Sequence, residues 1–540
     1  MRSPDPLSPR GPSPFSPFPV RRAQKQIPSS ESNTLVDYTY VGLAWQVLVG
    51  YAGPAVELTY IQQSGEPVGD AGDPYNGYDC FGRTVDIRWQ SATTDNTQLE
   101  RLLYGFDRDS RRTWRQRVLT TGLDNAYDYD GLSQVTRNAI GNLNLNTTAI
   151  SGIPAQNEAW RYDPTGNWNA YQTQANETVT LDQTRVYDKG NRLTQISGDP
   201  EPVLLDQVGR ILQVSPDATG DWTRSLVLQW DAWSRIVQIS ESESVITNYT
   251  YDGLSRRLTK TTDGVTLHTY YSDAWRPLEE RIDLQITPSA QYLWGARHRD
   301  DLVRRDRATT SGGTLDETRY VLMGYFNPAS IVDETGAVTE RYAFSSFGIR
   351  TILAPDFVPI ASSECAWDFA FQGQFLDEES GLLNYGYRYY SPPLGRWLSK
   401  DPIDEAGGLN LYAYALNNPI TGVDLFGLGP QLPEFPPGTT PEQMRQMAQA
   451  TQEAATNATN AAAPGSNAAN TAKALQDIAD AEATAATEAE LAAAGGMTTA
   501  EAISALVPPV GLGLCVISIC VGVISSHPGY LPKKPLFYGK

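Results

Sequence analysis

The stretch QWDAWSRIVQIS, residues 229–240, decides the fold of this chain. Its second half, IVQIS, predicts a β-strand, and the residues SLVLQW predict a preceding strand that ends at Trp230. Between the two strands, Asp231 can accept hydrogen bonds from its own turn backbone. Ser234, just before Arg235, tolerates the unusual backbone angles of such a turn. The stretch therefore predicts a β-hairpin with a tight turn.

The same pattern recurs along the chain, as an aromatic or apolar residue, an aspartate, a few loose residues and then alternating apolar residues. One hairpin is only marginally stable alone, so consecutive units are expected to pair edge to edge into a continuous sheet. We interpret the repeated aspartates as turn residues rather than catalytic ones. They are Asp130, Asp163, Asp188, Asp206, Asp231 and Asp252.

Composition excludes several classes of function. The chain has 540 residues, of which 40% are apolar and 10% aromatic, so it can bury a large core. Its formal net charge of −20 argues against nucleic acid as a partner, because a phosphate backbone requires a basic surface. Four scattered cysteines and three histidines argue against a zinc site. We predict no metal and no cofactor.

A long ordered motif follows the repeats: GQFLDEESGLLNYGYRYYSPPLGRWLSKDPIDEAGGLNLYAYALNNPITGVDLFGL, residues 373–428. With the repeats, it resembles the RHS repeat-associated core domain of the YD-repeat, or RHS, proteins, which are related to toxin-complex C proteins and teneurin-like shells. Upstream, IVDETGAVTERYAFSSFGIR, residues 331–350, resembles the entry to that domain. The resemblance extends from near Val36 to Leu428.

The resemblance implies an all-β fold in which YD-repeat hairpins form a strip that curls into a shell, while the core domain plugs one end. We expect four regions: a disordered Pro-rich arm over 1–35, which cannot form helix or sheet, YD repeats over 36–319, the core domain over 320–428, and a variable tail over 429–540. Some seven hairpins are expected to give a strip too short to close, so a truncated chain or a second chain that completes the wall is implied.

Aromatic side chains dominate one part of the core motif. We interpret Tyr385, Tyr387, Tyr389, Tyr390 and Trp397 as one alternating strand set, which the resemblance packs against the shell. The two arginines are read as ion-paired or stacked on aromatic rings. The motif residues are Tyr385, Tyr387, Arg388, Tyr389, Tyr390, Gly395, Arg396, Trp397 and Pro402.

Asp401 and Asp424 are the residues with potential chemistry. In RHS proteins two such aspartates, in D-P-x-G-L motifs, act as an aspartyl-protease-like pair that cuts the chain once. The resemblance thus implies a single self-cleavage between Leu428 and Gly429, in which two close carboxylates share a proton. This chain has DPIDE and DLFGL instead, and the extra acids and the lost proline are expected to disturb the pair. The alternative is that both aspartates only form turns.

The tail after Leu428 has a different composition. A Pro-rich spacer is followed by Ala-rich sequence that predicts two helices, at about 441–460 and 467–494. Residues 502–525 carry no charge, so they either insert into a membrane or are sequestered within the shell or tail. The tail offers no catalytic constellation of a nuclease or deaminase type.

Two classes of function remain open. One is a toxin-carrier shell with an effector-like tail that self-cleavage releases, whose partners are another toxin-complex chain and an immunity protein for the tail. The other is a non-enzymatic adhesion protein that contacts glycans or a cell surface. Any enzymatic activity is at most one turnover of aspartyl self-cleavage. Either class implies a secreted or cell-surface protein, although no signal peptide is seen.

Overall fold

Over the residues that the structure describes, the regular structure consists of antiparallel strands and three short 3₁₀ helices. In this computed structural model the helices are η1 (Phe371–Gly373), η2 (Asp404–Gly407) and η3 (Ala415–Asn417). The structure describes residues 20–26, 34–41, 45–69, 72–93, 96–146, 148–215, 223–241 and 244–429. The fold is thus nearly all β over these ranges, as predicted.

Two large antiparallel sheets form what we call the wall, and in each the strands pair in sequence order. The first sheet contains β1 (Val20–Gln26), β2 (Thr34–Val41), β3 (Trp45–Tyr51), β4 (Val56–Thr59), β5 (Asp86–Ser91), β6 (Gln98–Phe106), β7 (Arg112–Arg117), β8 (Asp124–Tyr129), β9 (Val135–Gly141), β12 (Gln156–Tyr162), β13 (Trp168–Ala175), β14 (Thr178–Tyr187) and β15 (Leu193–Ile196). A separate small hairpin is formed by β10 (Leu143–Asn144) and β11 (Ala149–Ile150).

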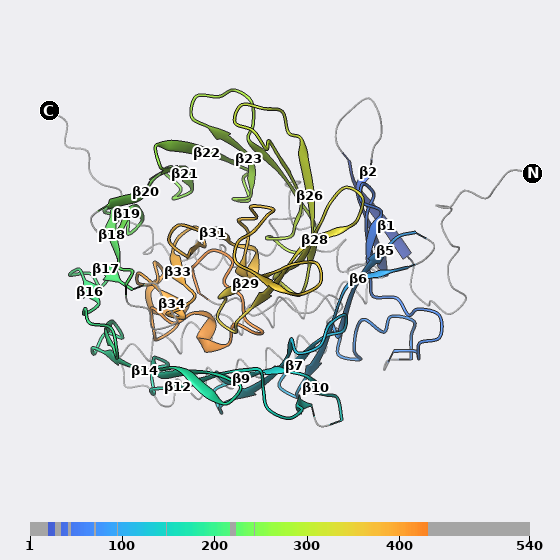
Figure 1. Cartoon of the computed structure of the whole chain (residues 1–540), viewed down its shortest axis with the longest axis horizontal. Coiled ribbons are helices and arrows are strands. Elements are labelled where there is room, and N and C mark those ends of the chain that lie inside the picture. The colour runs from blue at the N-terminus through green and yellow to red at the C-terminus, as the bar shows by residue number, and fades with distance from the viewer. Residues whose placement is uncertain are drawn as a thin grey trace, which may run out of the picture. The chain divides into compact units, whose positions relative to one another are not determined.

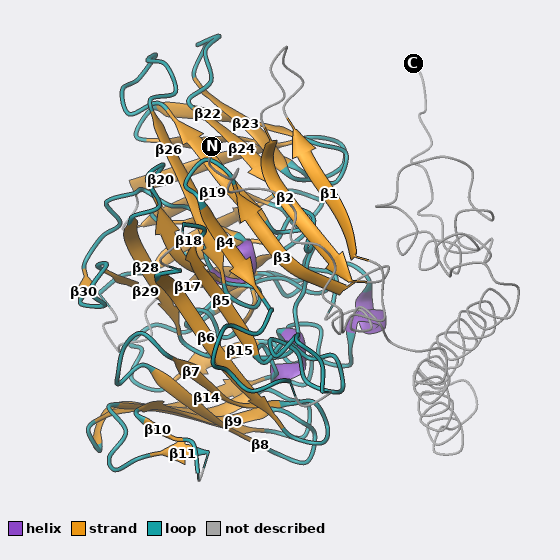
Figure 2. Ribbon diagram, turned by 90° about the vertical axis from the view of Figure 1, so that its right-hand side faces the viewer, coloured by secondary structure: helices purple, strands orange, loops and turns teal. Residues whose placement is uncertain are grey.

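The second sheet continues the same hairpin pattern to residue 360. It contains β16 (Leu204–Leu205), β17 (Ile211–Val214), β18 (Leu226–Trp230), β19 (Ile236–Glu241), β20 (Ser244–Tyr251), β21 (Arg257–Thr262), β22 (Val265–Tyr271), β23 (Pro277–Ile282), β24 (Ala290–Trp294), β25 (Leu302–Arg307), β26 (Glu317–Met323), β27 (Pro328–Val332), β28 (Val338–Phe344), β29 (Arg350–Leu353) and β30 (Pro359–Ile360). Figure 2 shows these strands running side by side, with the three short helices in purple.

The turn chemistry predicted from residues 229–240 is present. Asp231 Oδ1 accepts the backbone N–H groups of Trp233 and Arg235 at 2.9 and 3.0 Å, and Oδ2 accepts Arg235 Nε at 2.7 Å. Arg235 Nη1 then donates to the carbonyl of Asp252, in the next repeat, at 3.0 Å. This repeat turn is therefore closed by its own aspartate and tied to its neighbour.

The same turn also occurs where the sequence pattern did not single it out. In these turns the first residue donates its N–H to the carbonyl of the fifth, as in the recognised repeats. The additional turns of the wall include those that begin at Asp79, Asp107, Ser272, Asp333, Ser345 and Ala354.

The two ends of the wall overlap. Figure 1 shows the blue strands β2, β5 and β6 beside the yellow strands β26 and β28. Across this overlap, Trp89 Nε1 donates to the carbonyl of Met323 at 2.8 Å. Glu100, fully buried on β6, pairs with Arg117 at 2.6 Å and with Arg341 of β28 at 2.9 Å. The wall therefore returns on itself as a ring whose ends meet through side chains, while the edges of both described sheets stay open. The expectation of a strip rather than a sealed container stays a prediction.

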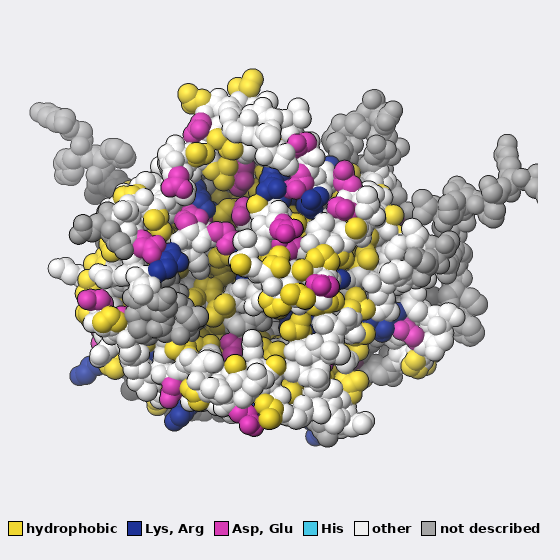
Figure 3. All heavy atoms as spheres, in the orientation of Figure 1, with side chains coloured by type: hydrophobic (Ala, Val, Ile, Leu, Met, Phe, Trp, Pro, Cys, Tyr) yellow, Lys and Arg dark blue, Asp and Glu magenta, His cyan; other side chains and the backbone are white. Residues whose placement is uncertain are grey.

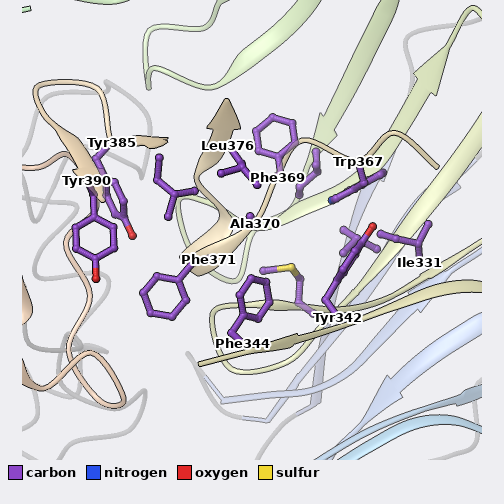
Figure 4. Close-up of a cluster of buried hydrophobic side chains, with 14 of the residues drawn as sticks. Ile331, Tyr342, Phe344, Trp367, Phe369, Ala370, Phe371, Leu376, Tyr385 and Tyr390 are labelled. Carbon is purple, nitrogen blue, oxygen red and sulfur yellow. The ribbon is translucent and has the colours of Figure 1, made fainter. Parts of the chain in front are cut away.

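Residues 361–429, which we call the plug, lie inside this ring (Figure 1). A four-stranded sheet forms its centre, made of β31 (Phe375–Asp377), β32 (Leu382–Asn384), β33 (Tyr389–Ser391) and β34 (Arg396–Trp397). Hydrophobic side chains are visible in the hollow between wall and plug (Figure 3). Figure 4 shows the cluster that joins the two parts, with Ile331, Tyr342 and Phe344 from the wall and Trp367, Phe369, Ala370, Phe371, Leu376, Tyr385 and Tyr390 from the plug.

Two expected domain boundaries, and the expected continuity of the sheet, differ from the structure. Residues 20–26 of the expected disordered arm form β1, which pairs with β2. The expected start of the core domain at residue 320 falls inside β26, because the wall sheet continues to residue 360. The continuous sheet is split between β15 and β16.

The predicted tail helices and the apolar segment 502–525 lie outside the described residues. Over the part of the chain that is described, no helix is long and apolar enough to cross a membrane.

Candidate functional site

Asp401 and Asp424, the predicted pair, meet at one nitrogen atom of Arg388. Nη2 of Arg388 lies 2.7 Å from Asp401 Oδ2 and 3.3 Å from Asp424 Oδ2. All three side chains are buried. Asp401 follows β34, and its N–H donates to the carbonyl of Leu411 at 3.0 Å, which fixes its place in the plug. Two carboxylates 23 residues apart in sequence thus share one cation.

Asp424 also holds the peptide bond at which cleavage was predicted. Its Oδ1 accepts the N–H groups of Gly427 at 2.7 Å and Leu428 at 3.0 Å. Its Oδ2 accepts the N–H of Gly429 at 2.9 Å. The nitrogen of the Leu428–Gly429 bond is therefore in direct contact with a carboxylate of the pair.

Arg388 is fixed by contacts on every side. Its guanidinium carbon lies 4.1 Å from the ring centroid of Trp397. Nη1 donates to the carbonyl of Leu411 at 3.3 Å, and Nε donates to the carbonyl of Gly427. These bonds connect the aspartate pair to the segment that carries the predicted cleavage point.

Two glycines allow the segment to approach Asp401 closely. A Cβ atom on Gly407 would lie 2.4 Å from Asp401 Oδ2, closer than any real contact. A Cβ atom on Gly429 would lie 3.0 Å from Gly407 Cα. Side chains at either position would force the backbone of η2, or of the segment, away from the carboxylate.

Burial shifts the pKa values of Asp401, Asp424 and Arg388. Desolvation raises the pKa of Asp401 to about 6, against the opposing charge of Arg388 and with a contribution from Asp424. Desolvation also raises the pKa of Asp424, while Arg388 and the N–H groups of Gly429, Leu428 and Gly427 lower it. The pKa of Arg388 is lowered, again by desolvation.

The two aspartates are therefore chemically different. Asp424 accepts four backbone N–H groups, those of residues 426–429, and these hydrogen bonds oppose the rise in its pKa that burial causes. Asp401 Oδ1 accepts the N–H of Ile403, at 3.0 Å, and its raised pKa favours the acid form below about pH 6. Pairs whose environments differ in this way can divide the roles of acid and base.

The residues that differ from the family motif lie beside this site. The extra acids Asp404 and Glu405 have exposed side chains on η2, so solvent screens them from the pair. At Leu425, where the family has proline, the segment is held by the hydrogen bonds to Asp424 and by Arg299, which donates to the Leu425 carbonyl.

We expected the aromatic residues of the core motif to form one strand. The structure shows that they do not. Tyr385 and Tyr387 lie in the connection between β32 and β33, because the chain turns back there. Tyr385, Tyr390 and Trp397 are buried and pack round Tyr414 inside the plug.

Other motif residues contact the wall. Tyr389 is buried against Tyr249 of β20, with ring centroids 5.9 Å apart. A Cβ atom on Gly395 would lie 2.0 Å from Trp168, so only glycine fits there. Arg396 Nη2 donates to the carbonyl of Asn191 at 2.6 Å. Pro402, by contrast, is exposed.

Sequence reasoning did not identify Arg388 as the centre of the site. It treated this arginine as an ordinary ion pair or a stacked side chain, and the structure shows both contacts at once. One signal was available: an arginine inside the buried aromatic run YGYRYY needs carboxylate partners, because a lone buried charge is costly. Among the described residues, no group of three or more His, Cys, Asp or Glu side chains could hold a metal.

The sequence profile of one protein family, described as Teneurin YD-shell, matches residues 78–420, which is more than half of the chain. The toxin subunit YenC1 of Yersinia entomophaga is 27% identical over 356 residues, covering 60% of this chain and 35% of that protein. The toxin protein Tse5 of Pseudomonas aeruginosa is 30% identical over 272 residues, covering 44% and 19%. This chain spans only about a third or less of the length of these relatives.

Solved structures share the fold. A crystal structure of TcdB2-TccC3 aligns with a TM-score of 0.56 at 19% identity, covering 76% of this chain and 21% of that one. The Tc holotoxin pore of Photorhabdus luminescens also aligns with a TM-score of 0.56, at 18% identity, covering 77% and 20%.

Proposed function

The chain belongs to the Teneurin YD-shell family, and on this premise we propose that its plug cuts the chain once, between Leu428 and Gly429, by an aspartyl mechanism. The observation that carries the proposal is the contact of Asp424 with both Arg388 and the N–H of Gly429. A carboxylate that touches the leaving nitrogen is in the right place to deliver a proton to it.

In the proposed reaction, the Asp424 carboxylate removes a proton from a water molecule whose oxygen attacks the carbonyl carbon of Leu428. The Asp401 carboxylic acid gives its proton to the carbonyl oxygen, which forms a tetrahedral diol. Asp424 then passes its proton to the nitrogen of Gly429, the C–N bond breaks, and Asp401 recovers its proton. The products are a carboxyl group on Leu428 and an amine on Gly429, and both aspartates return to their starting forms.

Within this proposal, the wall and plug carry the segment 429–540 as an effector-like tail that the cut separates from the body. The toxin names of the relatives support this role. An immunity protein for the tail, and delivery outside the producing cell, belong to the same proposal.

A second toxin-complex chain is the proposed partner of the wall. The paired names in the matched structure, TcdB2 and TccC3, support it. Apolar side chains exposed on the repeat turns also support a partner surface: Phe81 is 64% exposed, Trp233 74% and Leu254 59%. The same side chains would suit the alternative function, adhesion to a glycan or a cell surface, which needs no cleavage.

Denaturing electrophoresis with intact-mass measurement tests the proposal, because the tail can stay bound after the cut. The unmutated chain should give a body ending at Leu428 and a fragment of 112 residues, 429–540. Asp401→Asn and Asp424→Asn should each leave one intact species. Asp404→Asn, which changes an exposed carboxylate nearby, should cleave normally. A single 59.2 kDa species from the unmutated chain, stable for days at mildly acidic and neutral pH, would refute the proposal.

A further inference from the structure

One repeat turn of the wall carries a tryptophan at its fourth position. That position has a left-handed backbone, which small residues adopt most easily. In the turn that begins at Ser272 the position holds Trp275, with φ of 62°. A bulky residue in this region is an outlier, and such strain is retained where the side chain has a task. The corresponding residues of most other turns are small, namely Gly82, Ser110, Ser133, Gly166, Asn191, Gly209, Ser234, Ser255, Gly336 and Gly348, while the turn 354–358 holds Phe357.

The indole of Trp275 points to the segment that precedes the cleavage point. Its ring lies edge-on to Phe426, with centroids 5.9 Å apart and an interplanar angle of 87°. It also packs on Tyr387, with centroids 4.7 Å apart, and Tyr387 N–H donates to the carbonyl of Phe426 at 3.1 Å. A Cβ atom on Gly386 would lie 3.2 Å from the indole, so glycine gives the ring its space.

Arg299, also from the wall, covers the other side of Phe426. Its guanidinium carbon lies 4.1 Å from the centroid of the Phe426 ring, and Nη1 donates to the carbonyl of Leu425. Phe426 is thus held between an indole and a guanidinium, only two residues before Leu428.

The turn of Trp275 and the loop of Arg299 are joined to each other. Arg276, the fifth residue of this repeat turn, donates to the carbonyls of Gly295, His298 and Arg299, at 3.3, 3.0 and 2.6 Å. Trp275 and Arg299 therefore lie on two segments of the wall that are hydrogen-bonded to each other.

A cavity of about 60 Å³ lies beside this unit, between wall and plug. Trp275, Arg299, Tyr385 and Gly386 are among the residues that line it. Loss of the indole would enlarge the cavity and give Phe426 room to move.

We propose that Trp275 and Arg299 are positioning residues of the cleavage site, through which the wall holds the segment 425–427 so that the Leu428–Gly429 bond stays against Asp424. This rests on the proposed self-cleavage. It makes the cut depend on a wall that has folded round the plug, because the clamp and the aspartates come from different parts of the fold.

Cleavage rates of pulse-labelled chains, made by cell-free translation and followed on denaturing gels, test the clamp. Trp275→Ser should slow the cut by roughly tenfold or more, since small misplacements of reacting groups have effects of this size. Trp275→Phe should keep most of the rate. Leu284→Ser, which removes an apolar side chain that is 97% exposed, should change nothing. The pH at which the rate is halved should be the same in all variants, because the aspartates are untouched.

Melting temperatures on the Asp401→Asn background separate positioning from stability. Serine suits the left-handed position, so Trp275→Ser should melt close to its parent. If Trp275→Ser melts well below its parent, Arg299→Gln is the deciding variant. Slower cleavage by Arg299→Gln with an unchanged melting temperature supports the positioning role. Cleavage by Arg299→Gln at the unmutated rate overturns that role. Cleavage of Trp275→Ser within twofold of the unmutated rate also overturns the positioning role, but leaves the proposed self-cleavage intact. An unmutated chain that never cuts overturns both the positioning role and self-cleavage.

Discussion

Asp424 accepts the N–H of Gly429 through Oδ2 at 2.9 Å, so the second aspartate of the pair already touches the nitrogen that cleavage would release. Asp401 is linked to Asp424 through Arg388, whose Nη2 lies 2.7 Å from Asp401 Oδ2. In the proposed cleavage, this asymmetry favours Asp424 for proton transfer to the nitrogen and leaves acid catalysis at the carbonyl oxygen to Asp401.

The pH dependence of cleavage follows from the raised pKa of Asp401. Its acid form is present below about pH 6 and is lost above it, so the rate should fall about tenfold per pH unit on the alkaline side. Time courses between about pH 4.5 and 8 on denaturing gels measure this profile. Asp404→Asn should leave the profile unchanged, and a rate that rises from pH 6 to 8 would contradict the assignment.

Removal of Arg388 should both stop cleavage and destabilise the plug. Arg388→Met leaves two buried carboxylates without their cation, which costs about 3–5 kcal/mol in the free energy of unfolding. The cost should be much smaller when Asp401 and Asp424 are both already Asn, because no charge is then left unpaired. Urea unfolding of the four chains measures this coupling, and equal costs in both backgrounds would show that Arg388 acts by packing alone.

Tyr389→Ala should lower the free energy of unfolding by about 3–5 kcal/mol, as for other buried aromatics. Tyr389 is 2% exposed, and its hydroxyl contacts Arg257 and the hydroxyl of Tyr251, each at 3.2 Å. Tyr389→Phe, which keeps the ring, should cost only about 1 kcal/mol. Urea unfolding on the intact Asp401→Asn chain is the measurement, and a midpoint unchanged by alanine would disprove the burial.

Glu100→Gln should open or weaken the overlap of the wall. Glu100 is fully buried between Arg117 and Arg341, so its loss leaves two cations poorly paired, at a cost of about 3–5 kcal/mol. Glu241→Gln is the matched control, because its pair with Arg224 lies at the surface and should be worth at most about 1 kcal/mol. Similar unfolding midpoints for the two variants would show that Glu100 does not close the ring.

Glu280 should make the protein less stable as the pH rises. Desolvation, with the charge of Asp368, raises its pKa from 4.5 to about 7. A raised carboxyl pKa favours the folded state below about pH 4.5, and this advantage is lost as the pH rises to 7. Glu280→Gln should therefore stabilise the chain by on the order of 3 kcal/mol at pH 8, and by little at pH 4.5. Urea unfolding at the two pH values checks this; no gain at pH 8 would contradict the raised pKa.

The hairpin repeats could be predicted from sequence because their interactions are local. Asp231 and Arg235 are four residues apart and bond to each other, so one short stretch holds all the information for its turn. The alternation of Leu226, Val227 and Leu228 likewise gives the buried and exposed faces of a strand directly. The aspartate pair was found by the order of its motifs.

Only the tertiary structure showed how these parts meet. The overlap of the wall joins Trp89 to Met323, and the site joins Arg388 to Asp424. Trp275 reads in sequence as one more turn residue, yet it contacts Phe426, 151 positions further along the chain. Such contacts leave no local pattern, because they depend on the curvature that many twisted hairpins accumulate together and on the place where that curvature brings the wall against the plug.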